Sequence, residues 1–168
     1  MADNSTSENK ESGSLVVKSS RFGEIAVPES SVIELPSGII GFPTHKKFVL
    51  IDYKPPFSWL HSVEDQDLAF VVVDGFQFGD AYGVKPPIGD KDCDITESDE
   101  YALLVLITVS SDPKETTANL KAPVFINIRT KKGLQVIYDD PRFSTRFPLW
   151  GGELKPAGAK NIEKTESE

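Results

Sequence analysis

Cysteine is nearly absent from this sequence, and no long hydrophobic run occurs in it. Cys93 is the single cysteine, so no disulfide can form within the chain and no cysteine-based zinc site can be built. The longest apolar run, ALLVLITV at residues 102–109, is far shorter than the roughly 20 residues that span a bilayer. The N-terminal stretch MADNSTSENKESGS lacks the apolar region of a secretory signal. These absences predict a cytoplasmic protein with no membrane contact.

Histidine and the motifs of catalysis are also scarce. His45 and His61 are the only histidines, and the chain contains neither a G-x-S-x-G nucleophile motif nor a glycine-rich phosphate-binding motif. The acid-rich residues 90–101 carry Ile95 and Tyr101 where a calcium loop requires glycine and glutamate. We therefore expect no metal, no cofactor and no catalytic residue.

Three carboxylates stand between two apolar runs in FSWLHSVEDQDLAFVVVD, residues 57–74. Glu64, Asp65 and Asp67 lie where one predicted strand ends and the next begins, and aspartate tolerates the backbone geometry of such turns. General acid–base catalysis would instead need two carboxylates in one cleft, with environments that separate their pKa values. The pattern favours a turn, with His61 as a half-exposed strand residue. The alternative is a hydrolase or lyase in which Asp65 and Asp67 act with His61.

Basic residues are not in excess, and the acids are concentrated in one segment. The formal net charge is −8. In GDKDCDITESDE, residues 89–100, six acids against Lys91 leave −5: Asp90, Asp92, Asp94, Glu97, Asp99 and Glu100. Because nucleic-acid binding needs clustered Lys and Arg, this composition argues against a direct nucleic-acid ligand. The acidic segment could attract a basic protein partner, or it could be a solvated loop that only aids solubility.

Short strand patterns dominate the rest of the chain. We expect a single folded domain over residues 15–150, between disordered tails at 1–14 and 151–168. Apolar runs bounded by Gly, Pro, Asp and Ser predict strands at 15–18, 24–27, 32–35, 48–52, 59–63, 68–74, 103–109, 124–129 and 134–138. Residues 96–101 and 116–120 are short helix candidates. Residues 130–133, TKKG, predict a hairpin with Gly133 where a positive φ is needed. Many short strands imply a β-barrel or β-sandwich.

Three blocks of the sequence together resemble one family, the flagellar assembly factor FliW. They are PSGIIGF at 36–42, WLHSVEDQDLAF at 59–70 and NLKAP at 119–123. Each block alone is weak, but their order and spacing are specific, and the resemblance covers about residues 17–149. The chain departs from the family at Asp74-Gly75, where members usually carry Asp-Pro. The acidic residues 90–100 match no shared motif.

The resemblance implies a mostly β, antiparallel, barrel-like single domain with one or two short helices, and a binding protein without enzymatic activity. FliW-like proteins bind flagellin, whose helical termini expose apolar faces before assembly. When freed by flagellin export they bind the RNA-binding regulator CsrA and relieve repression of flagellin translation. Partner-binding candidates are then Trp59, Asp65, Asp67, Asp90, Asp92, Asp94, Glu97, Asp99, Glu100 and Asn119.

Each candidate residue also has a purely structural interpretation. Trp59 is typical of a core as well as of an interface, and Asn119 could cap a turn before Leu120. Asp65 and Asp67 could form a turn and still face a partner. A second alternative for the whole protein is a chaperone for flagellin or other secretion substrates that has no effect on CsrA.

Overall fold

The computed structural model describes residues 13–154, so most of the two predicted tails lies outside the described residues. Within this range the chain forms eleven strands and three short 3-10 turns. The strands are β1 (Ser14–Ser19), β2 (Gly23–Pro28), β3 (Ile33–Glu34), β4 (Lys47–Asp52), β5 (Phe57–Ser62), β6 (Ala69–Asp74), β7 (Tyr101–Thr108), β8 (Thr117–Ala118), β9 (Val124–Asn127), β10 (Gly133–Gln135) and β11 (Phe147–Pro148). The 3-10 turns are η1 (Glu29–Ser31), η2 (Gly75–Phe78) and η3 (Pro113–Glu115).

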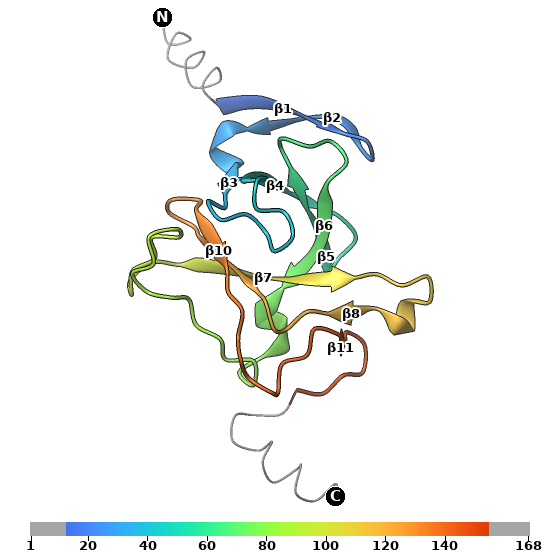
Figure 1. Cartoon of the computed structure of the whole chain (residues 1–168). Coiled ribbons are helices and arrows are strands. Elements are labelled where there is room, and N and C mark those ends of the chain that lie inside the picture. Colours follow the sequence, from blue (N-terminus) through green and yellow to red (C-terminus); the bar gives the residue numbers. More distant parts are fainter. Residues whose placement is uncertain (1–12, 155–168) are drawn as a thin grey trace, which may run out of the picture.

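The strands form a two-stranded hairpin, β1–β2, and a nine-stranded antiparallel sheet in the order β10-β9-β7-β6-β5-β4-β3, with β8 paired to β7 and β11. The hairpin lies at one end of the molecule and β8 and β11 lie at the other, with β7 crossing between them (Figure 1). The large sheet curls until its edge strands meet at one bridge, between Glu34 and Lys132. A single bridge does not close the barrel, so the expected antiparallel, barrel-like fold is confirmed as an open barrel.

The central strands are apolar on both faces because each face packs on a separate core. Alternate residues of a strand point to opposite sides of a sheet. In β7, Leu104 therefore enters the inner core enclosed by the curled sheet, while Val105 enters an outer core between the sheet and the loops. The inner core also holds Ile33, Leu35, Ile39, Phe48, Leu60, Val72, Val124 and Ile126. Burial on both faces explains the continuous runs VVV at 71–73 and ALLVLI at 102–107.

The β9–β10 hairpin forms as predicted, but the prediction for Gly133 is wrong. The positive φ, 62°, belongs to Lys131. Gly133 is required for a different reason: a Cβ there would lie 2.6 Å from the Phe125 carbonyl oxygen and 2.8 Å from Leu35 Cδ2. This glycine thus allows close packing of the edge strand on the inner core.

Neither helix candidate is a helix. Residues 96–100 form a turn and coil leading into β7, and residues 116–120 contain β8. Thr117 and Ala118 instead pair with Thr108 and Ile107 of β7, so contacts distant in sequence override the local preference. The short helices occur elsewhere, at η1, η2 and η3. Among residues 13–154, no helix is long and apolar enough to cross a membrane.

Candidate functional site: an aromatic groove

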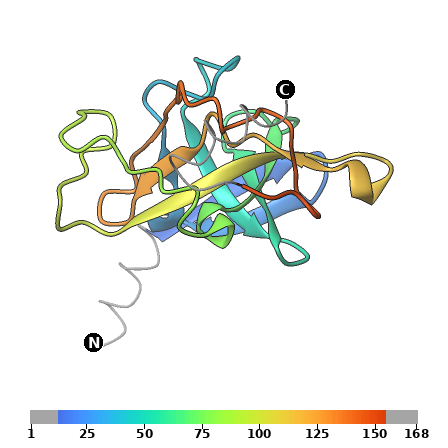
Figure 2. The same ribbon diagram turned by 90° about the horizontal axis from the view of Figure 1, so that it is seen from below.

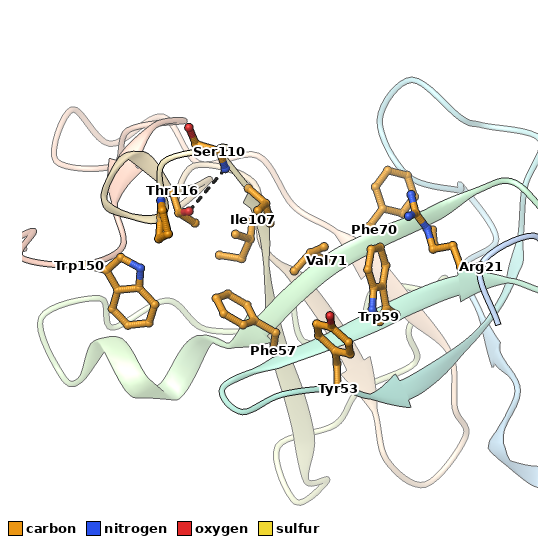
Figure 3. Close-up of a pocket in the computed structure, with 13 residues that line it drawn as sticks. Arg21, Tyr53, Phe57, Trp59, Phe70, Val71, Ile107, Ser110, Thr116 and Trp150 are labelled. Carbon is orange, nitrogen blue, oxygen red and sulfur yellow. Dashed lines mark hydrogen bonds between the residues drawn. The ribbon is translucent and has the colours of Figure 1, made fainter.

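An apolar groove of about 550 Å³ crosses the outer face of the sheet. Its floor is a row across three strands, because the register places Trp59 of β5 opposite Val71 of β6, and Val71 opposite Ile107 of β7. Phe57 and Ala69 extend this floor, and Phe70 borders it although its side chain packs on the inner core. Loop residues close the sides of the groove: Arg21, Tyr53, Val109, Ser110, Pro113, Thr116 and Trp150. Figure 3 shows Arg21, Tyr53 and Trp59 on one side of the groove and Trp150 with Thr116 on the other.

The groove lies on the same sheet face as the outer core but is not covered like it. Loops cover one part of that face, and the β1–β2 hairpin packs near the part that holds His61. Between these two covered parts, the groove has large apolar side chains that are exposed to solvent: Tyr53 is 48% exposed, Trp150 47% and Val109 60%. A clustered apolar surface of this kind is typical of a protein-binding site.

Trp59 is the most constrained side chain of the groove. The Arg21 guanidinium lies 4.5 Å from its ring centroid, and the rings of Phe22 and Tyr53 contact it edge-on at 5.9 and 6.0 Å. Its indole Nε1 is buried and has no hydrogen-bond partner in the structure. Trp59 is therefore a rigid aromatic platform stacked under a cation.

A buried polar network positions this corner of the groove. His61 is fully buried, not half-exposed as expected. Its Nδ1 lies 2.8 Å from the Ser62 carbonyl oxygen and its Nε2 lies 2.8 Å from Ser19 Oγ. Because the carbonyl can only accept, Nδ1 carries a proton, and in the neutral imidazole the Ser19 hydroxyl then donates to Nε2. Ser19 Oγ in turn accepts from the backbone N–H groups of Arg21 and Phe22, so His61 fixes the turn that presents Arg21.

The acids that follow β5 form a turn, which confirms that interpretation. Asp65 Oδ1 accepts from the Asp67 N–H at 2.9 Å, and Asp65 Oδ2 lies 3.3 Å from His45 Nε2. Ser62 Oγ accepts from the N–H groups of Glu64 and Asp65. The ring nitrogens of His61 are bonded to Ser19 and Ser62 instead of these acids, so the structure does not assemble the hydrolase alternative.

Three of the six acids in the acidic segment, Asp90, Asp92 and Asp99, accept hydrogen bonds within the fold. Asp99 accepts from Arg129 Nε at 2.9 Å and Nη2 at 3.0 Å, from the Thr96 N–H, and from Asn127 Nδ2. These bonds, led by those from Arg129, hold the pKa of the Asp99 carboxyl well below its usual range, and they raise the pKa of Arg129. Two further acids are also used internally: Asp90 Oδ1 accepts from the Asp92 N–H and Asp92 Oδ2 accepts from Ser37 Oγ.

The other half of the segment faces solvent. Asp94, Glu97 and Glu100 are exposed, and within residues 13–154 only Asp94 approaches a cation, Arg129, at 4.0 Å. Cys93 and Ile95, on either side of Asp94, are buried in the outer core, and burial raises the pKa of the Cys93 thiol. Viewed from below, the yellow-green loop before β7 and the gold loop after it project at opposite ends of that strand (Figure 2). The acidic segment and the groove are therefore separate surfaces.

Of the predicted binding residues, only Trp59 lines the groove. Asn119 forms the expected turn, since its Oδ1 accepts from the Lys121 N–H at 3.0 Å. Sequence reasoning missed Arg21, Tyr53 and Trp150, which reach the groove from three turns far apart in the chain. Their only local signal is an aromatic or cationic side chain in a polar turn. Among residues 13–154, no cluster of three His, Cys, Asp or Glu side chains could hold a metal ion.

Comparison with known proteins agrees with this fold and with the motifs. The family model "FliW protein" matches residues 16–149. The flagellar assembly factor FliW of Caldicellulosiruptor saccharolyticus is 40% identical over 138 residues, which cover 80% of this chain and 90% of the relative. That of Geobacter sulfurreducens is 38% identical over 151 residues, 86% of this chain and 94% of the relative. A crystal structure of the flagellar assembly factor FliW superposes with a TM-score of 0.72 at 31% identity, covering 83% of this chain and all of that one. The chain belongs to the FliW family.

Proposed function

We propose that this chain acts in flagellar assembly as a cytoplasmic binding protein without enzymatic activity. It binds unassembled flagellin, and when flagellin has been exported it binds the translational regulator CsrA and relieves repression of flagellin synthesis. Membership of the FliW family supports the assembly role, because its relatives are named flagellar assembly factors. The two partners follow from the family resemblance and from the two surfaces described above.

The observation that carries the proposal is the uncovered aromatic groove. An amphipathic helix binds proteins by laying its apolar face into a hydrophobic groove. The groove offers Trp59, Phe57, Val71 and Ile107 as a floor and Trp150 as a wall. Flagellin with exposed apolar helical faces would bury them here, and burial would also protect flagellin from aggregation before export.

The outward acids supply a second surface suited to CsrA. An RNA-binding protein presents basic groups, and Asp94, Glu97 and Glu100 face solvent beside the start of β7. Carboxylates attract such a partner and repel RNA phosphate by like charge. Glu100 of this surface and Ile107 of the groove are separated along β7 by about 23 Å, at roughly 3.3 Å per residue. That span is close to the roughly 30 Å diameter of a small domain, so two bulky partners could exclude one another.

Co-purification from the host at two salt concentrations tests the proposal. We expect the chain to retain flagellin at both, and to retain CsrA more weakly at the higher salt because exposed charges are screened. Retention of flagellin alone would support the chaperone alternative. Retention of neither would refute both binding proposals.

Charge-neutralising variants test the acidic surface separately. Changing Asp94, Glu97 and Glu100 to Asn or Gln should weaken CsrA binding about tenfold at moderate salt and leave flagellin binding unchanged. The matched control neutralises three exposed acids outside the acidic segment, Glu24, Glu29 and Glu34. Equal CsrA binding by the wild-type chain and the triple variant would remove the acidic segment from the interface.

A further inference from the structure

The aromatic groove carries a charge opposite to that of the whole chain. Among residues 13–154, Arg21 is the only charged side chain that lines it. Lys54 stands at the same rim, with its Nζ 5.9 Å from the Tyr53 ring centroid. No carboxylate within residues 13–154 forms an ion pair with either cation. A chain with net charge −8 thus holds two cations that have no carboxylate partner among residues 13–154, and both lie beside an open apolar groove.

Stacking on an aromatic ring holds each cation in place without neutralising it. The Arg21 guanidinium lies over the Trp59 face, and its turn is fixed by Ser19 and His61. A stacked guanidinium still directs its N–H groups outward in its own plane, where they match the two oxygens of a carboxylate. Because the side chain is already ordered, binding a carboxylate costs less conformational entropy.

We propose that the groove takes an amphipathic partner helix whose apolar face is bordered by Glu or Asp. The apolar residues pack on Trp59, Val71 and Ile107, while the bordering carboxylates pair with Arg21 and Lys54. This chemistry deepens the proposed function and rests on it only for the identity of the partner. It differs from what net charge alone predicts, because a chain at −8 would favour a basic helix.

The test uses two synthetic helical peptides with the same Leu face, one bordered by Glu and the other by Lys. Both tryptophans of the chain, Trp59 and Trp150, line the groove, so intrinsic fluorescence reports occupancy directly. We expect the Glu-bordered peptide to bind about tenfold more tightly, and an Arg21→Gln/Lys54→Gln variant to reduce that preference to about twofold. A Lys91→Gln/Lys132→Gln variant makes the same charge change at exposed positions outside the groove and should keep the preference.

Three outcomes would overturn the inference: equal affinity for the two peptides, tighter binding of the Lys-bordered peptide, or a preference that survives in Arg21→Gln/Lys54→Gln. Failure of both peptides to change the fluorescence would also overturn it. Purified host flagellin separates this inference from the proposed function. Undiminished flagellin binding by Arg21→Gln/Lys54→Gln would overturn the inference and leave the function standing. A preference for the Glu-bordered peptide without any flagellin binding would support the inference and overturn the proposed function.

Discussion

Single polar side chains connect distant segments by hydrogen bonds at both the groove and the acidic segment. At the groove, buried Ser19 joins His61 to the turn that carries Arg21. At the acidic segment, Asp99 joins β9 to the loop before β7 through Arg129 and Asn127. In both cases one polar side chain links its own turn to a segment distant in sequence, so its loss should affect the structure well beyond its own position.

Ser19→Ala should destabilise the protein. The substitution leaves buried His61 Nε2 and two backbone N–H groups without their partner, which costs about 2 kcal/mol of unfolding free energy. Urea denaturation followed by fluorescence measures this change. The neighbouring Ser20 is exposed and bonds only the Gln66 backbone, so Ser20→Ala should cost under about 0.5 kcal/mol. Equal effects of the two changes would contradict the role given to Ser19.

Asp99 should make stability depend on acid pH. Its pKa is lowered in the folded state, so its contribution is complete above the unfolded-state value of about 4 and is lost as pH falls through the folded-state value. Over a titration from pH 6 to about pH 2.5, we expect the unfolding free energy to decline once the pH falls below about 4. Asp99→Asn should be less stable at pH 6 and should show a shallower decline.

The control for that measurement removes the charge of an acid that faces solvent. Glu97 is exposed and makes no ion pair with residues 13–154. Glu97→Gln should therefore keep the wild-type pH profile. A profile of Asp99→Asn that runs parallel to the wild type would show that the Arg129 pair does not contribute to acid sensitivity.

At the level of elements, the sheet is stabilised by strands that pack on both faces. β9 illustrates this, because Val124 and Ile126 enter the inner core while Phe125 enters the outer one. A strand in this position tolerates little change in volume. Its partner β10 begins at Gly133, which lies against β9 with no space for a side chain.

Gly133→Ala should therefore destabilise the curled sheet. The added methyl group would contact the Phe125 backbone, which cannot move without disturbing both cores, and such overpacking costs about 1–3 kcal/mol. Thermal and urea denaturation would measure the loss. Lys132→Ala, at the preceding exposed position, should change stability by less than about 0.5 kcal/mol. If the Gly133→Ala protein were as stable as the wild type, β10 would have to shift enough to accommodate the added methyl group without loss of packing.

At the level of the whole molecule, β7 links two surfaces of opposite character. The loop before it presents carboxylates, and the loop after it helps to form an apolar groove whose two cations have no ion-pair partner in the described part of the chain. Net charge alone would describe the protein as uniformly acidic. Under the proposed function, the separation of the two surfaces would let one small domain recognise two different kinds of polypeptide.

Trp150→Ala should weaken flagellin binding more than it weakens the fold. Trp150 is 47% exposed and contacts Phe57 at the end of the groove, so truncation removes an aromatic anchor and should lower affinity tenfold or more, about 1.4 kcal/mol. Phe76 is a matched control, since it is 53% exposed, contacts Tyr101 and lies outside the groove. Titration calorimetry with purified flagellin should show Phe76→Ala within about twofold of wild type. Equal losses would place the binding site elsewhere.

Most longer strands could be predicted from the sequence because their apolar runs are local signals. The predicted 48–52 and 68–74 correspond to β4 and β6 within about two residues. The two-residue strands β8 and β11 were missed because they exist only through pairing with each other and with β7. Of the site, Trp59 was predicted, whereas Arg21, Tyr53 and Trp150 join it from separate turns, and no local pattern indicates that they meet.

The sequence by itself determined the family, because the order and spacing of the three motif blocks can be read along the chain. It also determined the turn at residues 64–67, because that turn depends on neighbouring residues. It also determined that no disulfide can stabilise the chain. Only the tertiary structure decided which acids remain available to a partner and where the apolar surface stays open. The reason is physical: Asp99 is neutralised by an arginine 30 residues away, and the groove exists because loops cover part of one sheet face and leave the rest exposed.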